Sequence, residues 1–243
     1  TGWAHGFNFA GRKFIYCHSP ARWLYLSDQY LGEKSTGPVP LLLKTLRPAL
    51  MMWDHWAAHR SAVYVANASV IKKRIENVYG KKDVPIFFPP HSVDVTAPVE
   101  PIPGLEEFTE SDDYFLIVSR LLPYKNVDKA VEACNELGKK LLVIGRGPEK
   151  ERLEALAGPT VRIASGVSDA QLRYAYRHCL ALLAISYEDF GITPLEAGAS
   201  GKAVIAYRAG GFLDTIQEGK TGMFINQPTV EQLVEALKAF NPD

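Results

Sequence analysis

The feature that most constrains the fold is an alternation of short apolar runs with amphipathic segments from residue 114 to the end of the chain. The apolar runs are mostly continuous, which is the pattern of strands covered on both faces. The segments between them have helical spacing, and helix-start signals stand at residues 168–171 and 229–232. This order predicts an α/β fold with a doubly wound, mainly parallel sheet. The expected strands are 14–17, 62–66, 86–88, 114–118, 141–144, 161–164, 180–185, 203–206 and 223–225.

A proline-rich stretch separates this series from the first part of the chain. Five prolines lie between Pro89 and Pro103, with few strongly apolar residues among them, as is typical of a linker. We therefore predict a partial N-terminal α/β domain over residues 1–97, a linker over 98–111 and a Rossmann-like domain over 112–243. The first domain has only about three expected strands, which is too few for a complete doubly wound sheet.

Charge and cysteine content exclude several classes of protein. The chain has 27 basic and 27 acidic residues, so it has no overall attraction to nucleic acid or to anionic membranes, and a bound anion must be held by a few local cations. Cys17, Cys134 and Cys179 are too far apart for a metal motif and are expected to be buried apolar residues. His55 and His59 lack the third ligand of a zinc site, so no metal is expected.

No run of about 18 uncharged apolar residues is present, so the sequence predicts no membrane-spanning segment. The nearest candidate is residues 41–56, which are rich in Leu, Met and Trp but are interrupted by Lys44, Arg47 and Asp54. This pattern predicts a long amphipathic helix. Such a helix packs into its own domain or contacts a membrane surface or a lipid-linked substrate, and both interpretations stay open.

Two cations follow the expected strand 114–118, namely Arg120 and Lys125. In an open α/β sheet, ligands bind beyond the carboxyl ends of the strands. Two cations at that edge are suited to a diphosphate. The alternative is a basic loop that is solvated and has no ligand.

A glycine turn, Gly145-Arg146-Gly147, follows the expected strand 141–144 and leads into a helix that starts near Glu149. Glycines at such a turn let the backbone approach a ligand at a helix N-terminus. The full dinucleotide pattern is absent, so an ordinary strand-to-helix turn is the alternative.

The most specific segment runs from Glu188 to Glu196, after the expected strand 180–185. Thr193, Pro194 and Glu196 fit a capping box, which gives Glu196 a purely structural interpretation. Glu188 and Glu196 would also surround the start of this helix, where the first backbone N–H groups have no partner within the helix. Carboxylates beside cations suit a ligand that has both hydroxyls and phosphates, such as a nucleotide-sugar.

Together these motifs resemble the retaining GT-B glycosyltransferases of the family "glycosyl transferases group 1". The resemblance is carried, in chain order, by the Arg120/Lys125 pair, the 145–148 turn, the Glu188/Glu196 pair and the segment Ala209-Gly210-Gly211. The segments at 16–23 and 114–120 look most like the bacterial branch that uses GDP-mannose. The resemblance implies a GT-B fold with a Rossmann-like C-terminal domain and an incomplete N-terminal domain.

The resemblance also implies roles for individual residues. Arg120 and Lys125 would neutralise the donor diphosphate, Glu188 would hold hydroxyls of the donor sugar, and His18 would lie near that sugar from the N-terminal part. Glu196 would accept hydrogen bonds from the ribose. The remaining donor-binding positions are Gly145, Gly147, Gly166, Val167, Ser168, Phe190, Gly191 and Ile192.

The expected function is transfer of a hexose, mannose from GDP-mannose, to a glycan or lipid-linked acceptor with retention of configuration. The expected partners are thus the nucleotide-sugar and this acceptor, and a peripheral contact with a membrane stays open. The expected location is the cytoplasm, either at the inner face of the membrane or away from it. The family's N-terminal domain begins with a glycine-rich loop and further strand–helix units that this sequence lacks. A nucleotide-sugar-binding fragment without turnover is therefore the alternative. A GT-B phosphorylase or epimerase would also keep the phosphate cations. A phosphorylase needs a pyridoxal-phosphate lysine motif, which is not seen in this sequence, and an epimerase releases free sugar and nucleotide without an acceptor.

Overall fold

The computed structural model of the chain describes residues 4–7, 10–26, 38–60, 62–91 and 93–241. The chain forms two compact units, Thr1–Pro89 and Pro90–Asp243. The sequence prediction puts the linker further along, at 98–111. In the structure this stretch belongs to the second unit, where it includes the short helix α5 (Glu106–Thr109) and the buried side chain of Ile102.

The second unit is built on a six-stranded parallel sheet with the strand order β5-β4-β3-β6-β7-β8. The order reverses between β3 and β6, which pair at Leu116 and Leu182. The sheet is therefore doubly wound, as the sequence predicts. Its strands are β3 (Tyr114–Val118), β4 (Lys140–Ile144), β5 (Val161–Ala164), β6 (Ala181–Ala184), β7 (Ala203–Tyr207) and β8 (Gly222–Ile225).

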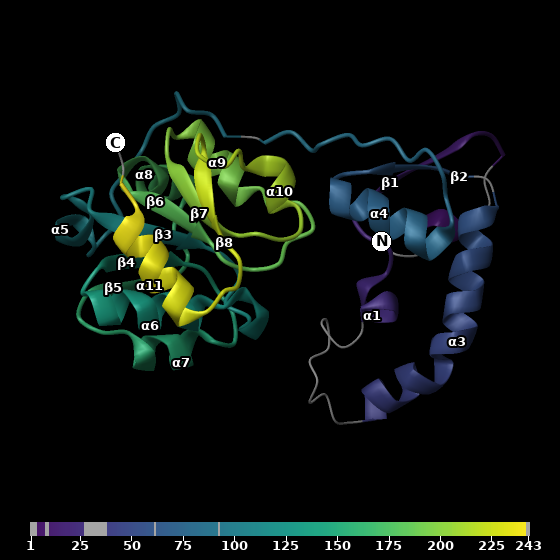
Figure 1. The fold of residues 1–243 in the computed structure, drawn as a ribbon, viewed down its shortest axis with the longest axis horizontal. Coiled ribbons are helices and arrows are strands. Elements are labelled where there is room, and N and C mark those ends of the chain that lie inside the picture. Colours follow the sequence, from purple (N-terminus) through teal and green to yellow (C-terminus); the bar gives the residue numbers. More distant parts are fainter. Residues whose placement is uncertain (1–3, 8–9, 27–37, 61, 92, 242–243) are drawn as a thin grey trace. The chain divides into compact units, whose positions relative to one another are not determined.

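Helices cover both faces of this sheet (Figure 1). One face packs Phe115 and Leu141 against α6 and α11, and the other packs Leu116 and Leu142 against α8 and α9. Alternate strand residues thus enter two separate apolar layers, which explains why the strand sequences are continuously apolar. The helices are α6 (Val127–Leu137), α7 (Lys150–Leu156), α8 (Asp169–His178), α9 (Thr193–Ala199), α10 (Phe212–Thr215) and α11 (Val230–Ala239), with the 3-10 turn η2 at Pro123–Lys125.

Two helix starts in this unit were predicted from capping signals. At α8, Ser168 accepts from the Gln171 backbone and the Gln171 side chain accepts from the Ser168 backbone, so the predicted capping box is confirmed. At α11, Thr229 accepts from the Gln232 backbone. The Gln232 side chain instead accepts from the backbone N–H groups of residues 226 and 227, which fixes the turn between β8 and α11.

The first unit contains a two-stranded parallel sheet of β1 (Lys13–Cys17) and β2 (Ala62–Ala66). The strand expected at 86–88 is reduced to one bridge between Ile86 and Ala66. Pro89 and Pro90 follow directly, and proline has no N–H with which to extend the ladder. Over its described residues, this unit has the helices η1 (Ala4–Gly6), α1 (Arg22–Tyr25), α3 (Pro38–His59) and α4 (Ser69–Tyr79). The expected amphipathic helix at 41–56 is α3.

A buried polar network holds this unit together. Asp54 of α3 is 2% exposed and accepts hydrogen bonds from Tyr25 at 2.6 Å and from Tyr79 at 2.9 Å. Its other oxygen lies 3.0 Å from Nε2 of His5, whose Nδ1 is 2.9 Å from the Tyr64 hydroxyl. The network therefore joins η1, α1, α3, β2 and α4 through one carboxylate.

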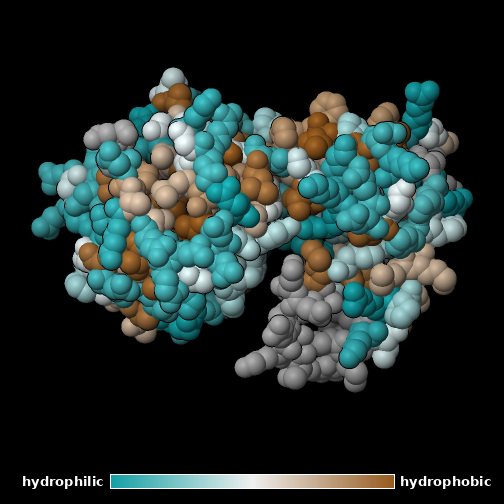
Figure 2. All heavy atoms as spheres, viewed as in Figure 1, coloured by the Kyte–Doolittle hydropathy of each residue, from teal (hydrophilic) through white to brown (hydrophobic). Residues whose placement is uncertain are grey.

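The surface of the molecule carries apolar side chains in several places (Figure 2). In the first unit, Phe14, Tyr16 and Val63 are exposed on one face of the two-stranded sheet. The three cysteines expected to be buried, Cys17, Cys134 and Cys179, are indeed buried, and none of the three is in a disulfide. Among the described helices, none is long and apolar enough to span a bilayer.

Candidate active site

The candidate site lies where the strand order of the second unit reverses. Loops leave the carboxyl ends of β3 and β6 side by side, because these strands are parallel neighbours. The outward splay of the loops at such a point provides the crevice where ligands of open α/β sheets bind. The loop after β3 carries Arg120 and Lys125, and the loop after β6 carries Glu188.

Lys125 and Glu188 meet at this point. Lys125 ends the turn η2 and is 9% exposed, and its Nζ pairs with Oε1 of Glu188. The hydroxyl of Ser186 donates to the same carboxylate oxygen at 2.7 Å. A cation and a carboxylate are thus held together by two loops that are 63 residues apart in the sequence. The arrangement offers one group for an anion and one for hydroxyls.

Asn126 fixes the position of Lys125. Its backbone is left-handed, with φ of 56°, a conformation that asparagine tolerates better than most residues. Its side-chain amide donates to the carbonyl of Ile185 at 3.0 Å. This bond ties the β3 loop directly to the end of β6. Sequence reasoning assigned no role to Asn126 or Ser186, because their partners are set by the sheet order.

Arg120 is exposed and lies on the same loop as Lys125. Its guanidinium donates to the hydroxyl of Tyr124 at 3.0 Å, while Nζ of Lys125 lies 5.1 Å from the centre of the Tyr124 ring. Tyr124 therefore contacts both cations. The exposed guanidinium keeps donors available for an anion.

The glycine turn after β4 packs against the same loop. A Cβ on Gly145 would lie 2.0 Å from the carbonyl oxygen of Ser119, and one on Gly147 would lie 2.1 Å from that of Leu121. The backbone N–H of Leu121 donates to the carbonyl of Arg146 at 2.8 Å. Glycine is required at both positions because two backbones touch here, so the turn supports the cation loop.

The Glu188 loop is held from the other side by the segment at 209–211. The Gly211 N–H donates to the carbonyl of Glu188 at 2.8 Å, and a Cβ on Gly210 would lie 2.1 Å from that oxygen. Gly191 has φ of +83° and faces the ring of Phe212. The glycines named by the sequence motif thus let this loop turn tightly and fix the Glu188 backbone.

Glu196 does not form the capping box that the sequence predicts. Helix α9 begins at Thr193, its N-cap is Ile192, and no side chain caps it. Oε2 of Glu196 instead accepts from the Tyr176 hydroxyl at 2.6 Å. Burial, and next the charge of the Glu196 carboxylate, raise the pKa of Tyr176, so this hydroxyl stays protonated and donates. The bond orients a half-buried carboxylate near the start of α9, and sequence spacing could not reveal it.

The other expected donor-binding positions differ in exposure. Phe190 is buried, whereas Ile192 is 46% exposed and Val167 is half-buried. Gly166 has φ of +75°, and the guanidinium of Arg146 lies over it, 2.9 Å from the position of a Cβ. Arg146 therefore reaches from the glycine turn to the loop before α8.

His18 belongs to the first unit, directly after β1. It is exposed, packs edge-on against Tyr16 with ring centroids 5.1 Å apart, and has its Nδ1 3.3 Å from the amide nitrogen of Asn67. Asn67 follows β2 directly, so both residues stand at the carboxyl edge of the small sheet. The structure thus groups Lys125 and Glu188 in one unit and places His18 in the other. Within the described residues, no group of three or more His, Cys, Asp or Glu side chains is placed to hold a metal ion.

Comparison with known proteins agrees with this geometry. Residues 101–242 match the family described as "Glycosyl transferases group 1". The chain belongs to this family. The match covers the whole sheet of the second unit and all the side chains described above except His18 and its neighbours.

Relatives within the family differ in their named activities. The chain is 33% identical over 133 residues to a glycogen synthase of Pseudomonas syringae, a match that covers 51% of this chain and 27% of the relative. It is 31% identical over 138 residues to a "GDP-mannose-dependent alpha-(1-6)-phosphatidylinositol monomannoside mannosyltransferase" of Mycobacterium tuberculosis, covering 49% and 36% of the two chains. The matches thus span only about a quarter to a third of these relatives.

Solved structures show the same fold. A sucrose-phosphate synthase of Thermosynechococcus elongatus has a TM-score of 0.71 at 19% identity, covering 98% of this chain and 61% of its own. Anabaena HepE in complex with UDP has a TM-score of 0.65 at 16% identity, covering 78% and 57%. With the parallel sheet, these similarities establish an α/β fold of the GT-B type with a Rossmann-like C-terminal unit.

Proposed function

We propose that this glycosyltransferase-family chain binds a nucleotide-sugar at the β3/β6 crevice and transfers its hexose, mannose from GDP-mannose, to a glycan or lipid-linked acceptor with retention of configuration. The observation that carries the proposal is the contact between Lys125 and Glu188. The donor of such a reaction has a diphosphate directly bonded to a polyhydroxylated sugar. A lysine and a carboxylate in contact match that junction.

Catalysis in this proposal is mainly electrostatic. The bond between the sugar carbon and the diphosphate breaks while the acceptor oxygen bonds to the same carbon, and the acceptor proton passes to the departing phosphate. Lys125 and Arg120 stabilise the charge that develops on that phosphate. Lys125 is nearly buried, and the next residue, Asn126, is bonded to the Ile185 carbonyl, so little reorganisation is needed during the reaction.

Glu188 and Glu196 take the two hydroxyl-bearing parts of the donor. Glu188 accepts from the sugar, with the backbone of residues 190–192 next to it, and Glu196 accepts from the ribose. Tyr176 donates to one oxygen of Glu196, so the other oxygen is available for a ribose hydroxyl. In this proposal the 145–147 turn and the 166–168 segment line the nucleoside side of the same crevice.

The choice of GDP-mannose rests on the segments at 16–23 and 114–120 and on the mannosyltransferase relative of Mycobacterium tuberculosis. A second candidate donor is a nucleotide-glucose, because the relatives also include several glycogen synthases. A third possibility is donor binding without turnover, since the matched relatives are about three to four times as long as the matched segment.

A donor comparison separates these possibilities. Isothermal titration of the purified chain with GDP, UDP and ADP, followed by turnover assays with GDP-mannose, UDP-glucose and ADP-glucose, should show the tightest binding for GDP. The Glu188→Gln variant removes the charge that pairs with Lys125 and serves as the site control in the turnover assay. Tighter binding of UDP or ADP would contradict GDP-mannose as the donor and favour a nucleotide-glucose. Absence of binding to all three nucleotides would contradict the site itself.

A further inference from the structure

Tyr124 contacts both cations of the β3 loop, and the proposed function assigns it no role. The guanidinium of Arg120 donates to the Tyr124 hydroxyl at 3.0 Å. Nζ of Lys125 lies 5.1 Å from the centre of the same ring. Tyr124 is 39% exposed, so a ligand can reach part of its side chain. One tyrosine thus touches the two side chains that are proposed to hold the donor diphosphate.

The turn that carries Tyr124 fixes its position. Tyr124 is the middle residue of η2, which Pro123 begins and Lys125 ends. Proline has a fixed φ angle, and the N–H of Lys125 donates to the carbonyl of Leu122 at 2.9 Å. The next residue, Asn126, is bonded to the end of β6. The backbone is therefore held on both sides of Tyr124.

The bond with Arg120 determines what the Tyr124 hydroxyl can still do. A guanidinium has only donors, so the hydroxyl oxygen is the acceptor in this bond. The phenolic hydrogen is left for another acceptor. Within the described part of the chain, no residue accepts it. Donation by a charged group also polarises the hydroxyl and strengthens its own donation. Tyr124 therefore has an unused donor that a neighbouring cation has activated.

We propose that Tyr124 is a third donor to the diphosphate, and that its hydroxyl donates to a non-bridging phosphate oxygen of the nucleotide. This inference rests on the proposed function, because it needs the diphosphate to lie at Arg120 and Lys125. The proton stays on Tyr124 throughout. Negative charge grows on the phosphate as its bond to the sugar breaks, so the hydrogen bond strengthens during the reaction. Since the hydroxyl is neutral, it adds no repulsion between the two cations.

The alternative role for Tyr124 is to hold Arg120 in place without touching the ligand. In that role the hydroxyl matters only while Arg120 is present. In the proposed role it contributes without Arg120 as well, because its own hydrogen goes to the phosphate. The contact between the ring and Lys125 is separate from both roles, since phenylalanine keeps the ring. The two roles therefore give different results in a double-mutant cycle.

The test is isothermal titration of the 243-residue chain and of Tyr124→Phe, Arg120→Ala and the double variant, with GDP and with guanosine. Tyr124→Phe should weaken GDP binding by about tenfold or more, which is the scale of a hydrogen bond to a charged group. Guanosine binding should stay the same. In the Arg120→Ala background, Tyr124→Phe should still weaken GDP binding by at least about threefold, less than before because the polarising cation is gone.

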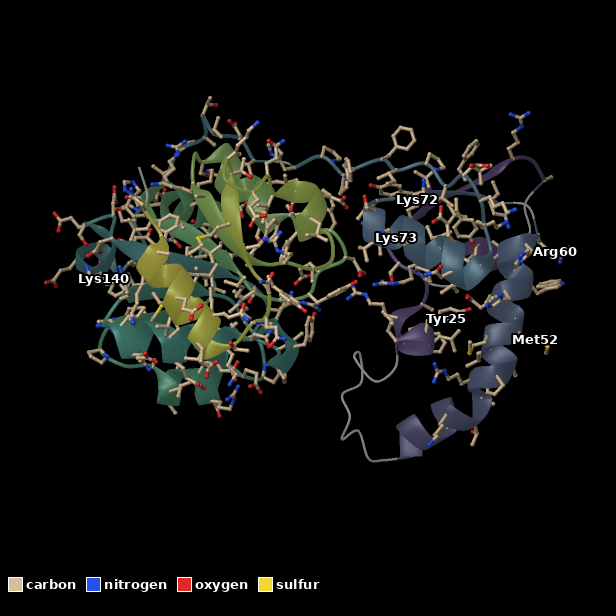
Figure 3. All side chains as sticks on the ribbon, in the orientation of Figure 1. Tyr25, Met52, Arg60, Lys72, Lys73 and Lys140 are labelled. Atoms are coloured by element: carbon tan, nitrogen blue, oxygen red, sulfur yellow. The ribbon has the colours of Figure 1, made fainter. Side chains whose placement is uncertain are left out.

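Matched controls change a tyrosine and a lysine of the same unit. Tyr174→Phe removes a hydroxyl from α8, where the Tyr174 ring stacks on His178 at 4.1 Å. Lys140, labelled in Figure 3, begins β4 at the opposite edge of the sheet, with its Nζ 5.5 Å from the centre of the Phe108 ring. Its charge is paired with Asp113 at 2.9 Å. Tyr174→Phe and Lys140→Ala should bind GDP and guanosine as the parent chain does.

Three outcomes would overturn the inference. Unchanged GDP affinity of Tyr124→Phe would show that the hydroxyl does not reach the phosphates. A loss that disappears in the Arg120→Ala background would make Tyr124 a positioning residue for Arg120. Equal losses for GDP and guanosine would place the hydroxyl against the nucleoside. All three leave GDP binding by the parent chain intact, whereas absence of that binding would contradict the proposed function itself.

Discussion

The two units of the chain are stabilised in different ways. In the second unit, six parallel strands are covered on both faces, and strand side chains enter two apolar layers. In the first unit, two parallel strands leave Phe14, Tyr16 and Val63 exposed on one face, and its centre is a carboxylate that accepts from tyrosines. Parallel sheets are normally covered on both sides, and two strands alone are marginal. Stability in the first unit therefore depends on a few polar contacts, whereas in the second it is spread over a large apolar core.

This difference bears on function. The proposed nucleotide site needs loops held within narrow limits, and it lies on the unit with the six-stranded sheet. The unit with the smaller sheet leaves apolar side chains of α3 exposed, among them Met52 and Trp56. The proposed donor site thus lies in the part of the chain that has the larger apolar core.

The largest expected effect comes from separating the units. Residues 90–243 should fold cooperatively and bind GDP as the full chain does, because their core is complete. Residues 1–89 alone should show no cooperative thermal transition. Circular dichroism melting and titration with GDP measure both results. An unfolded fragment 90–243, or a fragment 1–89 that melts cooperatively, would contradict the proposed difference in stability between the two units.

Removing the carboxylate at the centre of the first unit should have the next largest effect. Asp54→Ala leaves His5, Tyr25 and Tyr79 without their shared partner and should destabilise the first unit by about 3–5 kcal/mol. All four tryptophans lie before residue 60, so their fluorescence in urea reports on this unit. The control Glu76→Ala removes a half-exposed partner of a surface lysine and should change stability by less than about 0.5 kcal/mol.

The same carboxylate makes the first unit sensitive to acid. Burial acts to raise the pKa of Asp54, but hydrogen bonds from His5, Tyr25 and Tyr79 outweigh it and lower that pKa. The folded state thus holds the proton less tightly than the unfolded state. Its contribution to stability is complete above the ordinary Asp pKa of about 3.9 and is lost as the pH falls below it. An acid-insensitive tryptophan transition, or one that Asp54→Asn leaves unchanged, would contradict this role.

In the second unit, the stability effects of replacing two glycines by alanine can be compared: Gly147 lies against another backbone, and Gly198 has open space around it. Gly147→Ala puts a Cβ 2.1 Å from the Leu121 carbonyl oxygen and should cost about 3 kcal/mol of stability. Gly198→Ala meets nothing within 4 Å in helix α9 and should be neutral or stabilise the chain by up to about 1 kcal/mol. Circular dichroism in urea measures both. Similar stabilities of the two variants would show that the 145–147 turn does not support the cation loop.

The smallest effect is expected from Tyr176→Phe. Losing one hydrogen bond to Glu196 should reduce affinity by about 1 kcal/mol for GDP and for guanosine alike, because both contain the ribose. Tyr174→Phe, on the same helix, is the matched control and should bind normally. A loss for GDP with guanosine unchanged would place Glu196 near the phosphates, and unchanged binding of both would make the Tyr176–Glu196 bond purely structural.

Much of the second unit could be predicted from the sequence. Its strands were found because continuous apolar runs are what a doubly covered sheet requires, and Ser168 was found because its capping partner is local. The failures came from contacts that are distant in sequence. Glu196 has the spacing of a capping box, but Tyr176 donates to it from another helix. Asn126 and Ile185 are 59 residues apart and meet only because β3 and β6 are neighbours.

The first unit was harder to predict for a related reason. Residues 86–88 have strand composition, but the prolines that follow them limit pairing to one bridge. The network around Asp54 joins five elements, and nothing in the local sequence marks His5 as its partner. Apolar periodicity identifies elements; it does not identify the long-range polar bonds that hold a small sheet together.

The central claim is that Lys125 belongs to a diphosphate site. Isothermal titration of the parent chain and of Lys125→Ala with GDP and with guanosine tests it most directly, with Lys150→Ala as a surface control that removes only an exposed pair with Glu154. The account predicts that Lys125→Ala weakens GDP binding by about 1.5–3 kcal/mol, while guanosine binding stays the same and Lys150→Ala binds both normally. Equal losses for GDP and guanosine, or no loss for either, would contradict it.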